Sequence, residues 1–129
     1  MSWTALLENP EGIDSVFQGS PPPLEGVHIH EVGLNREGPT LRVRFDLSDY
    51  PAQAPRKWQL QGFNTVQVEL LFGGLRSVEI SGFSVEPVGD ITLTRDETVH
   101  VVISSNETSI RAVADTVSIT KTAAYLDDR

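Results

Sequence analysis

Strict alternation of apolar and polar residues is the feature that most constrains the fold of this chain. In the segment 41–47, Leu-Arg-Val-Arg-Phe-Asp-Leu, every odd position is apolar and every even position is charged. This period of two is typical of a β-strand with one buried face and one solvated face. Similar alternation recurs near residues 27–34, 66–70, 78–80, 91–93, 99–103, 110–114 and 117–119. We therefore expect about eight strands.

The first 19 residues follow a helical period instead. Apolar residues recur at positions 3, 6 and 7 and again at 13, 16 and 17, so each segment presents one apolar stripe. Between them, Asn9 suits a helix cap and Pro10 a first helical position. Gly19 ends the second helix, and residues 20–23 form an extended, proline-rich crossing into the strands.

Loop lengths predict the register between successive strands, because residues that face each other in a hairpin lie on the same side of the sheet. By this rule Ile103 pairs with Ile110, and Ala114 pairs with Val117. The expected fold is α+β, mainly β: an antiparallel, largely meander sheet, curved or partly barrel-like. One or two short N-terminal helices pack on its apolar face.

Length and composition narrow the classes of protein further. We expect one domain over residues 1–129, with a helical segment over 1–19 and the sheet over 24–121. Eighteen acidic against ten basic residues give a net charge of -8, which argues against direct nucleic-acid binding. The chain has no cysteine and no segment typical of a membrane span or secretion signal. A cytoplasmic protein without a cofactor is expected.

The Gly73-Gly74 connection determines where two acidic residues lie. A two-residue turn there would bury Glu79, so the parity rule favours a three-residue loop that sets Glu69 opposite Glu79 on the solvated face. The other odd register sets Glu69 opposite Ser77. Two facing carboxylates resemble a glycosidase pair, but they equally suit a surface adapted to a cationic partner, or two solvated charges.

The positions around these acids are short or polar, which leaves a flat and accessible sheet face. Val102 and Val113 are expected to point to the same face, which would give the polar rim an apolar centre, as protein interfaces have. The candidate partner-binding residues are Glu69, Glu79, Gln67, Thr92, His100 and Val102. An ordinary solvated face, or the contact surface of a homodimer, explains the same pattern.

Three histidines supply an alternative. His28 and His30 lie two residues apart on the first strand, so both can reach one zinc ion with His100 or Glu31 as third ligand. Two solvent-facing histidines are the plainer explanation, and a switch of parity after Ile29 indicates a β-bulge beside them. The alternative function is a small-ligand- or metal-binding sheet protein, or an enzyme, that uses His28, His30 and His100.

Other motifs point away from catalysis. The chain has no Gly-x-Ser-x-Gly elbow and no phosphate-binding Gly-Lys-Ser or Gly-Lys-Thr, so we expect no enzyme. Arg42 and Arg44 share a strand face and should pair with acids on neighbouring strands. Residues 48–57 form the longest connection, an Ω-like loop. Trp58 follows it and is more typical of a core lid than of a ligand platform.

Several ordered stretches are distinctive as a set. They are Ser2-Trp3-Thr4-Ala5-Leu6-Leu7-Glu8-Asn9-Pro10, Pro22-Pro23-Leu24, Gly38-Pro39-Thr40-Leu41, Arg44-Phe45-Asp46-Leu47, Pro55-Arg56-Lys57-Trp58 and Phe63-Asn64-Thr65-Val66-Gln67-Val68. In these the chain resembles the Immunity protein 50 family, small bacterial proteins encoded beside toxins of polymorphic toxin systems. The resemblance implies a non-catalytic cytoplasmic protein that binds and neutralises a cognate protein toxin. A homo-oligomeric structural protein is the second alternative.

Overall fold

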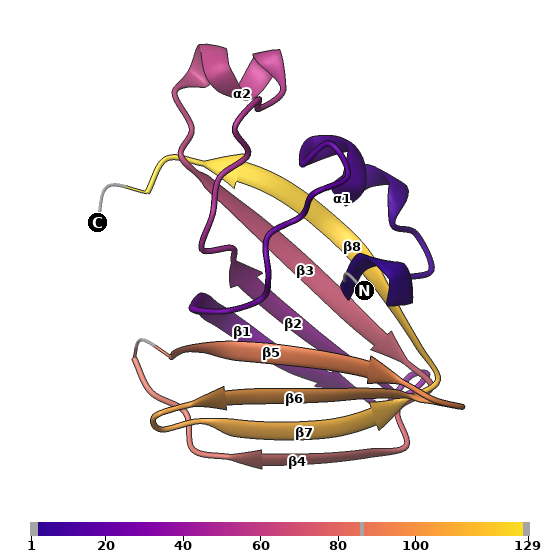
Figure 1. The fold of residues 1–129 in the computed structure, drawn as a ribbon. Coiled ribbons are helices and arrows are strands. Elements are labelled where there is room, and N and C mark those ends of the chain that lie inside the picture. The colour runs from indigo at the N-terminus through magenta and orange to yellow at the C-terminus, as the bar shows by residue number, and fades with distance from the viewer. Residues whose placement is uncertain (1–2, 86, 128–129) are drawn as a thin grey trace.

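The computed structural model describes residues 3–85 and 87–127. Across them, eight antiparallel strands form one sheet in the order β4-β7-β6-β5-β1-β2-β3-β8, and the sheet is not closed (Figure 1). The strands are β1 Val27–Asn35, β2 Thr40–Asp46, β3 Thr65–Gly73, β4 Ser77–Ser81, β5 Val88–Arg95, β6 Val99–Ser105, β7 Ser109–Ala114 and β8 Thr116–Tyr125. The helical elements are η1 Trp3–Leu6, α1 Glu11–Val16 and α2 Arg56–Gln61.

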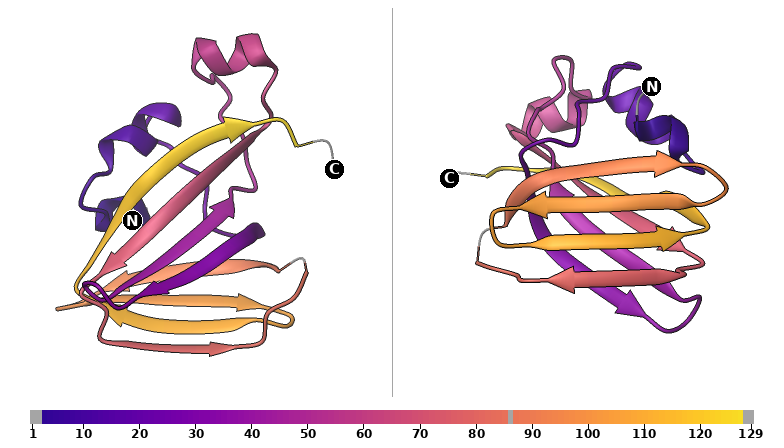
Figure 2. Two further views of the ribbon diagram at one scale, coloured as in Figure 1. Left: turned by 180° about the vertical axis from the view of Figure 1, so that it is seen from behind. Right: turned by 60° about the horizontal axis from the view of Figure 1, so that its bottom comes forward.

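The sheet folds over on itself where β1 meets β5. Among the described residues these strands share two pairs, Val27 with Gly89 and His28 with Val88. As a result β1, β2, β3 and β8 form one layer, and β5, β6, β7 and β4 form the other (Figures 1 and 2). A Cβ atom at Gly89 would lie 2.2 Å from the carbonyl oxygen of Ser104, so this junction needs a glycine.

The core lies between the two layers, and most of it comes from the alternate strand residues that the sequence pattern pointed inward. Among them are Leu41, Val43, Phe45, Val66, Val68, Leu70 and Phe72 in one layer and Val99, Val101, Ile103, Ile110, Ala112 and Ala114 in the other. Leu7, Ile13 and Phe17 of the N-terminal segment pack into the same cluster. Because side chains alternate along a strand, the intervening polar residues form two outer faces, one on each layer. The predicted mainly β, antiparallel fold is confirmed.

Two details of the predicted strands are also confirmed. Ile103 pairs with Ile110 across the β6–β7 turn. The register of β1 against β2 shifts between Ile29 and Glu31, which is the bulge that the change of parity indicated. Local patterns in the sequence were sufficient for both, because each concerns strands that are neighbours in the chain and in the sheet.

Two predicted hairpins are wrong, those at Gly73-Gly74 and at Asp115. β3 pairs with β2 and β8, whereas β4 pairs with β7. Ala114 pairs with Val99 and not with Val117. At both connections the chain crosses from one layer to the other, so the successive strands lie in different layers. The two crossings contact each other, since the Asp115 N–H donates to the Gly73 carbonyl at 2.9 Å.

The N-terminal helices form where the sequence predicted them, but their cap is different. Pro10 is the N-cap residue of α1, and the structure shows no side-chain cap there. Asn9 was predicted to be that cap, and it instead forms two hydrogen bonds with the main chain of Ile119 on β8. The outer edge of β8 offers a main-chain N–H and C=O, which satisfy both ends of the amide.

The segment expected to be an Ω-like loop leads into a helix, α2, that the sequence pattern missed. Pro55 precedes it and Gly62, with φ at 70°, ends it. Trp58 packs against the core from α2, and its ring lies 6.4 Å from that of Tyr50. The interpretation of Trp58 as a core lid is confirmed. The two apolar residues of α2, Trp58 and Leu60, are two positions apart, so its sequence shows no helical period.

Candidate partner-binding surface

The structure separates the two acidic residues that the sequence placed opposite each other. Glu79 lies on β4 opposite Arg111 of β7. Glu69 lies on β3 opposite Arg44 of β2, in the other layer. The predicted Glu69–Glu79 pairing is therefore wrong, and so is the alternative register with Ser77. The six candidate residues consequently divide between the two outer faces.

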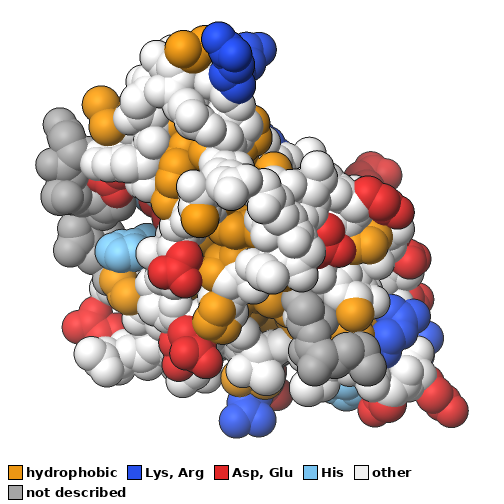
Figure 3. Space-filling view, turned by 45° about the horizontal axis from the view of Figure 1, so that its top comes forward, with side chains coloured by type: hydrophobic (Ala, Val, Ile, Leu, Met, Phe, Trp, Pro, Cys, Tyr) orange, Lys and Arg blue, Asp and Glu red, His pale blue; other side chains and the backbone are white. Residues whose placement is uncertain are grey.

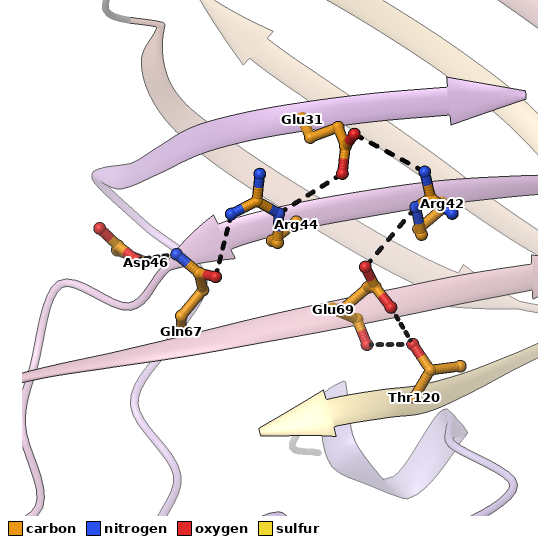
Figure 4. A network of polar contacts seen from close by, with 7 residues as sticks. All are labelled: Glu31, Arg42, Arg44, Asp46, Gln67, Glu69 and Thr120. Carbon is orange, nitrogen blue, oxygen red and sulfur yellow. Dashed lines mark hydrogen bonds and ion pairs between the residues drawn. The ribbon is translucent and has the colours of Figure 1, made fainter. Parts of the chain in front are cut away.

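Glu69 belongs to a network of ion pairs on the outer face of β1, β2, β3 and β8 (Figure 4). Its Oε1 lies 3.5 Å from Arg42 Nε, and its Oε2 accepts a hydrogen bond of 2.6 Å from the Thr120 hydroxyl. Glu31 lies 3.7 Å from Arg42 and 3.4 Å from Arg44. The prediction that both arginines pair with acids on neighbouring strands is confirmed. The charge of Glu69 is balanced within the molecule.

The same network continues to Asp46, a buried carboxylate at the end of β2. Arg44 donates to Gln67 Oε1 at 3.1 Å, and Gln67 Nε2 donates to Asp46 Oδ1 at 3.1 Å. His30 Nε2 lies 2.7 Å from Asp46 Oδ2, and the Tyr125 hydroxyl donates to the same oxygen. A buried carboxylate persists only where such partners replace water. Gln67, a candidate for partner binding, and His30, a candidate for zinc binding, are thus both engaged by the buried Asp46 carboxylate.

The candidate zinc ligands are spread over two strands. His28 pairs with Val88 on β5, whereas His100 pairs with Thr94, six residues further along the same strand. At about 3.3 Å per residue, this separates the two histidines by roughly 20 Å. In the described part of the chain, no three histidine, aspartate or glutamate side chains are grouped so that they could hold a metal ion.

Four of the candidates, Glu79, Thr92, His100 and Val102, share the outer face of β4, β7, β6 and β5. Glu79, Arg111, Val102 and Thr92 are successive partners in one row across these strands. His100 lies two residues before Val102 on β6. We call the outward-facing side chains of these four strands the open face. In the right-hand view of Figure 2, none of the described helices covers it.

A shallow hollow of about 290 Å³ lies in the open face. Val102 and Val113 line it together with Glu79, His100 and Arg111. The two valines are half-buried, whereas Glu79 and Arg111 are exposed. An apolar centre with a polar, charged border is the usual anatomy of a protein-binding surface.

His100 also contacts the loop between β5 and β6, where its Nε2 lies 3.3 Å from Asp96. The backbone N–H of Thr98, aided by the nearby imidazole, holds the pKa of the Asp96 carboxyl below its ordinary value of 3.8. These contacts join the His100 side chain to the loop at the border of the open face.

Acidic side chains are spread over the surface, as the face in Figure 3 shows. Basic side chains lie at several separate places on this face, one of them its projecting end over α2, where Arg56 and Lys57 are exposed. The open face carries Glu79 and Asp90 together with Arg111, so opposite charges nearly balance there. The net charge of -8 is therefore a property of the whole chain and does not come from one sheet face.

A family model, Immunity protein 50, matches residues 9–125. This chain belongs to the Immunity protein 50 family. Members of the Immunity protein 50 family are immunity proteins of toxin systems and are typically non-catalytic. Comparisons with curated proteins and with solved structures found no match. No helix in the described ranges is long and apolar enough to cross a membrane.

Arg111 is the open-face residue that sequence reasoning missed. The alternation over residues 110–114 already pointed it outward, between the buried Ile110 and Ala112. Its position opposite Glu79 depends on the pairing of β4 with β7, strands separated by about 30 residues of chain. No local pattern contains that pairing.

Proposed function

We propose that this member of the Immunity protein 50 family binds and neutralises a cognate protein toxin through the open face. The match to an immunity protein family over residues 9–125 supports the first part, because toxin neutralisation is what such a family implies. Glu79, Thr92, His100 and Val102 are the residues that we assign to the contact.

The contrast between the two outer faces supports the second part. On the layer with β2 and β3, Arg42, Arg44 and Glu69 already pair with each other or with Glu31. A partner would have to break these contacts to reach the charges. On the open face, Glu79 and Arg111 are exposed and lie opposite each other in the register of β4 and β7. Among the described residues neither of them forms an ion pair, unlike the charges of the other outer face. The half-buried valines beside it add apolar area at the centre.

Long-range attraction is a separate contribution. A net charge of -8 attracts a cationic protein and raises the rate of encounter, although it adds less to final affinity. Toxins that act on nucleic acids need basic surfaces to bind phosphate. A basic toxin domain is thus the partner that the charge of this chain favours.

The test is titration calorimetry with the toxin encoded beside this protein. Glu79→Lys and Val102→Asp should each weaken binding about tenfold or more, because they place a like charge or a desolvated carboxylate in the contact. Glu37→Lys is the matched control. It makes the same charge change at an exposed residue of the β1–β2 turn, away from the open face.

The outcomes separate the two parts of the proposal. If Glu79→Lys and Val102→Asp bind as tightly as the control, the open face is the wrong surface while neutralisation stands. If the wild-type protein neither binds nor inhibits this toxin, the proposed function itself is wrong.

A further inference from the structure

The edge of β5 that faces away from β6 is left without a strand partner over much of its length. β1 pairs with residues 88 and 89 alone among the described positions of β5. Beyond them, Ile91 donates its N–H to the carbonyl of Leu24 at 2.8 Å. After this one bond, the chain that leads up from η1 supplies no further main-chain partner in the described structure.

The phase of the ladder shows which main-chain groups face this edge. In an antiparallel pair, residues that bond to the neighbouring strand alternate with residues that point away from it. Since the Ile91 N–H points away from β6, those of Leu93 and Arg95 do so as well. At the far end the Asp96 N–H donates to the Thr98 carbonyl at 3.1 Å, which fixes the same phase.

A groove of about 680 Å³ runs beside these groups. Its walls are β5, the side chains of Trp3 and Leu6 on η1, and the crossing Pro21–Pro23. Three successive prolines have no N–H to offer, so the crossing cannot complete the ladder itself. The Trp3 indole N–H donates to the Pro22 carbonyl at 2.9 Å and holds this wall in place.

We infer that an extended segment of the toxin adds to the edge of β5 in this groove, as a further antiparallel or parallel strand. The inference rests on the proposed function and specifies how one segment of the toxin is bound. Unpaired N–H and C=O groups two residues apart match the repeat of an extended chain, and apolar walls accommodate alternate side chains. Thr92 lines both the groove and the open face, so one partner can cover both.

The charges along the groove define the chemistry of the segment. Glu25 and Asp90 are exposed at the end near Leu24, and Arg95 is exposed at the other. A basic residue therefore belongs at the Glu25 end of the bound segment, and an acidic or neutral residue beside Arg95.

A second copy of this chain does not fit the same site. Strands must approach to about 4.8 Å to pair. The edge of β5 lies between η1 and the proline crossing, and the same walls would flank the β5 edge of the second molecule. Two edges recessed in this way cannot meet, whereas a protruding extended segment can enter.

Hydrogen exchange followed by NMR on the wild-type protein tests the inference directly. On saturation with the neighbouring toxin, the amides of Leu93 and Arg95 should exchange at least about tenfold more slowly. The amides of Thr92 and Thr94 face β6 in both states and serve as internal controls. Unchanged exchange of Leu93 and Arg95 in a saturated complex overturns strand addition and leaves the proposed function intact.

Substitution provides an independent measurement. Leu93→Pro removes an N–H that β6 does not use, and it should weaken toxin binding about tenfold. Leu93→Ala retains the N–H and should bind more tightly than Leu93→Pro. Equal affinity of the two variants contradicts the inference. Should Leu93→Pro not fold, the exchange of the wild-type amides decides alone, and a wild type that does not bind the toxin overturns both proposals.

Discussion

The side-chain amide of Asn9 is hydrogen-bonded at both ends to the main chain of Ile119, which follows it by 110 residues. Asn9 Nδ2 donates to the Ile119 carbonyl at 2.8 Å, and the Ile119 N–H donates to Asn9 Oδ1 at 2.9 Å. The amide thus occupies the place that a neighbouring strand would take on the edge of β8. The contact closes an exposed sheet edge and ties the helical N-terminal segment to the last strand.

Loss of this contact should destabilise the protein. Asn9→Ala removes two hydrogen bonds, and we expect the free energy of unfolding to fall by about 1–2 kcal/mol. Asn9→Asp keeps the acceptor and loses the donor, so its stability should lie between those of Asn9→Ala and the wild type. Urea denaturation measures all three. Equal stability of Asn9→Ala and the wild type would show that these two hydrogen bonds do not stabilise the fold.

Asp46 should matter more, because it is 2% exposed and three side chains direct donors at it. Asp46→Ala leaves the donors of Gln67 and Tyr125 without their acceptor, and we expect it to cost at least about 2 kcal/mol. Tyr125→Phe removes the hydrogen bond from the Tyr125 hydroxyl to Asp46 and should cost about 1 kcal/mol. Thermal or urea unfolding checks both values, and a larger loss for Tyr125→Phe than for Asp46→Ala would be inconsistent with this network.

The junction between the layers depends on Gly89. A methyl group there would lie 2.2 Å from the Ser104 carbonyl oxygen, so Gly89→Ala should lower the free energy of unfolding by about 2 kcal/mol or more. Gly12→Ala in α1 is the matched control, because a Cβ there meets nothing within 4 Å. It should leave stability unchanged or raise it by about 0.5–1 kcal/mol. A stable Gly89→Ala protein would show that the layers can join in another way.

Much of the fold follows from local patterns, and the remainder depends on contacts between distant segments. The alternation in residues 41–47 identifies a strand and its buried face whatever its neighbours are. The same pattern contains nothing about which strand lies beside it. Gly73-Gly74 is equally compatible with a tight hairpin and with a crossing between layers, and only the latter puts β4 beside β7.

The prediction of the candidate surface was right about which way each side chain points and wrong about which strands lie side by side. Glu79, Thr92, His100 and Val102 were predicted to share a face, and they do, because their outward direction follows from alternation along each strand. Glu69 was grouped with them through a hairpin that does not form. The buried Asp46 was missed because its partners come from three strands, one of which is 79 residues away in the chain.

The loop at the border of the open face should respond to acid. The Thr98 N–H and His100 hold the pKa of Asp96 below 3.8 in the folded protein. A lowered pKa means that the charged carboxylate stabilises the folded loop. This stabilisation is fully present above the ordinary pKa, and it is lost as the pH falls through the lowered value. NMR titration of the Asp96 carboxyl should show a midpoint below 3.8.

Asp96→Asn is the control for this titration. It retains a side-chain oxygen for the Thr98 N–H but has no carboxyl group to titrate. The Thr98 amide signal should follow the titration in the wild type and lose that response in Asp96→Asn. A midpoint at or above 3.8 for Asp96 would show that the folded loop does not favour the charged form.

If this protein neutralises its toxin by direct binding, adding it should abolish the toxin's activity, and a titration of that activity shows whether it does. The activity of the neighbouring toxin is followed while the purified protein is added in increasing amounts. We predict that toxin activity falls in proportion to added protein and disappears near one equivalent, and that Glu79→Lys inhibits about tenfold less well. Full toxin activity in the presence of a large excess of wild-type protein would contradict the account.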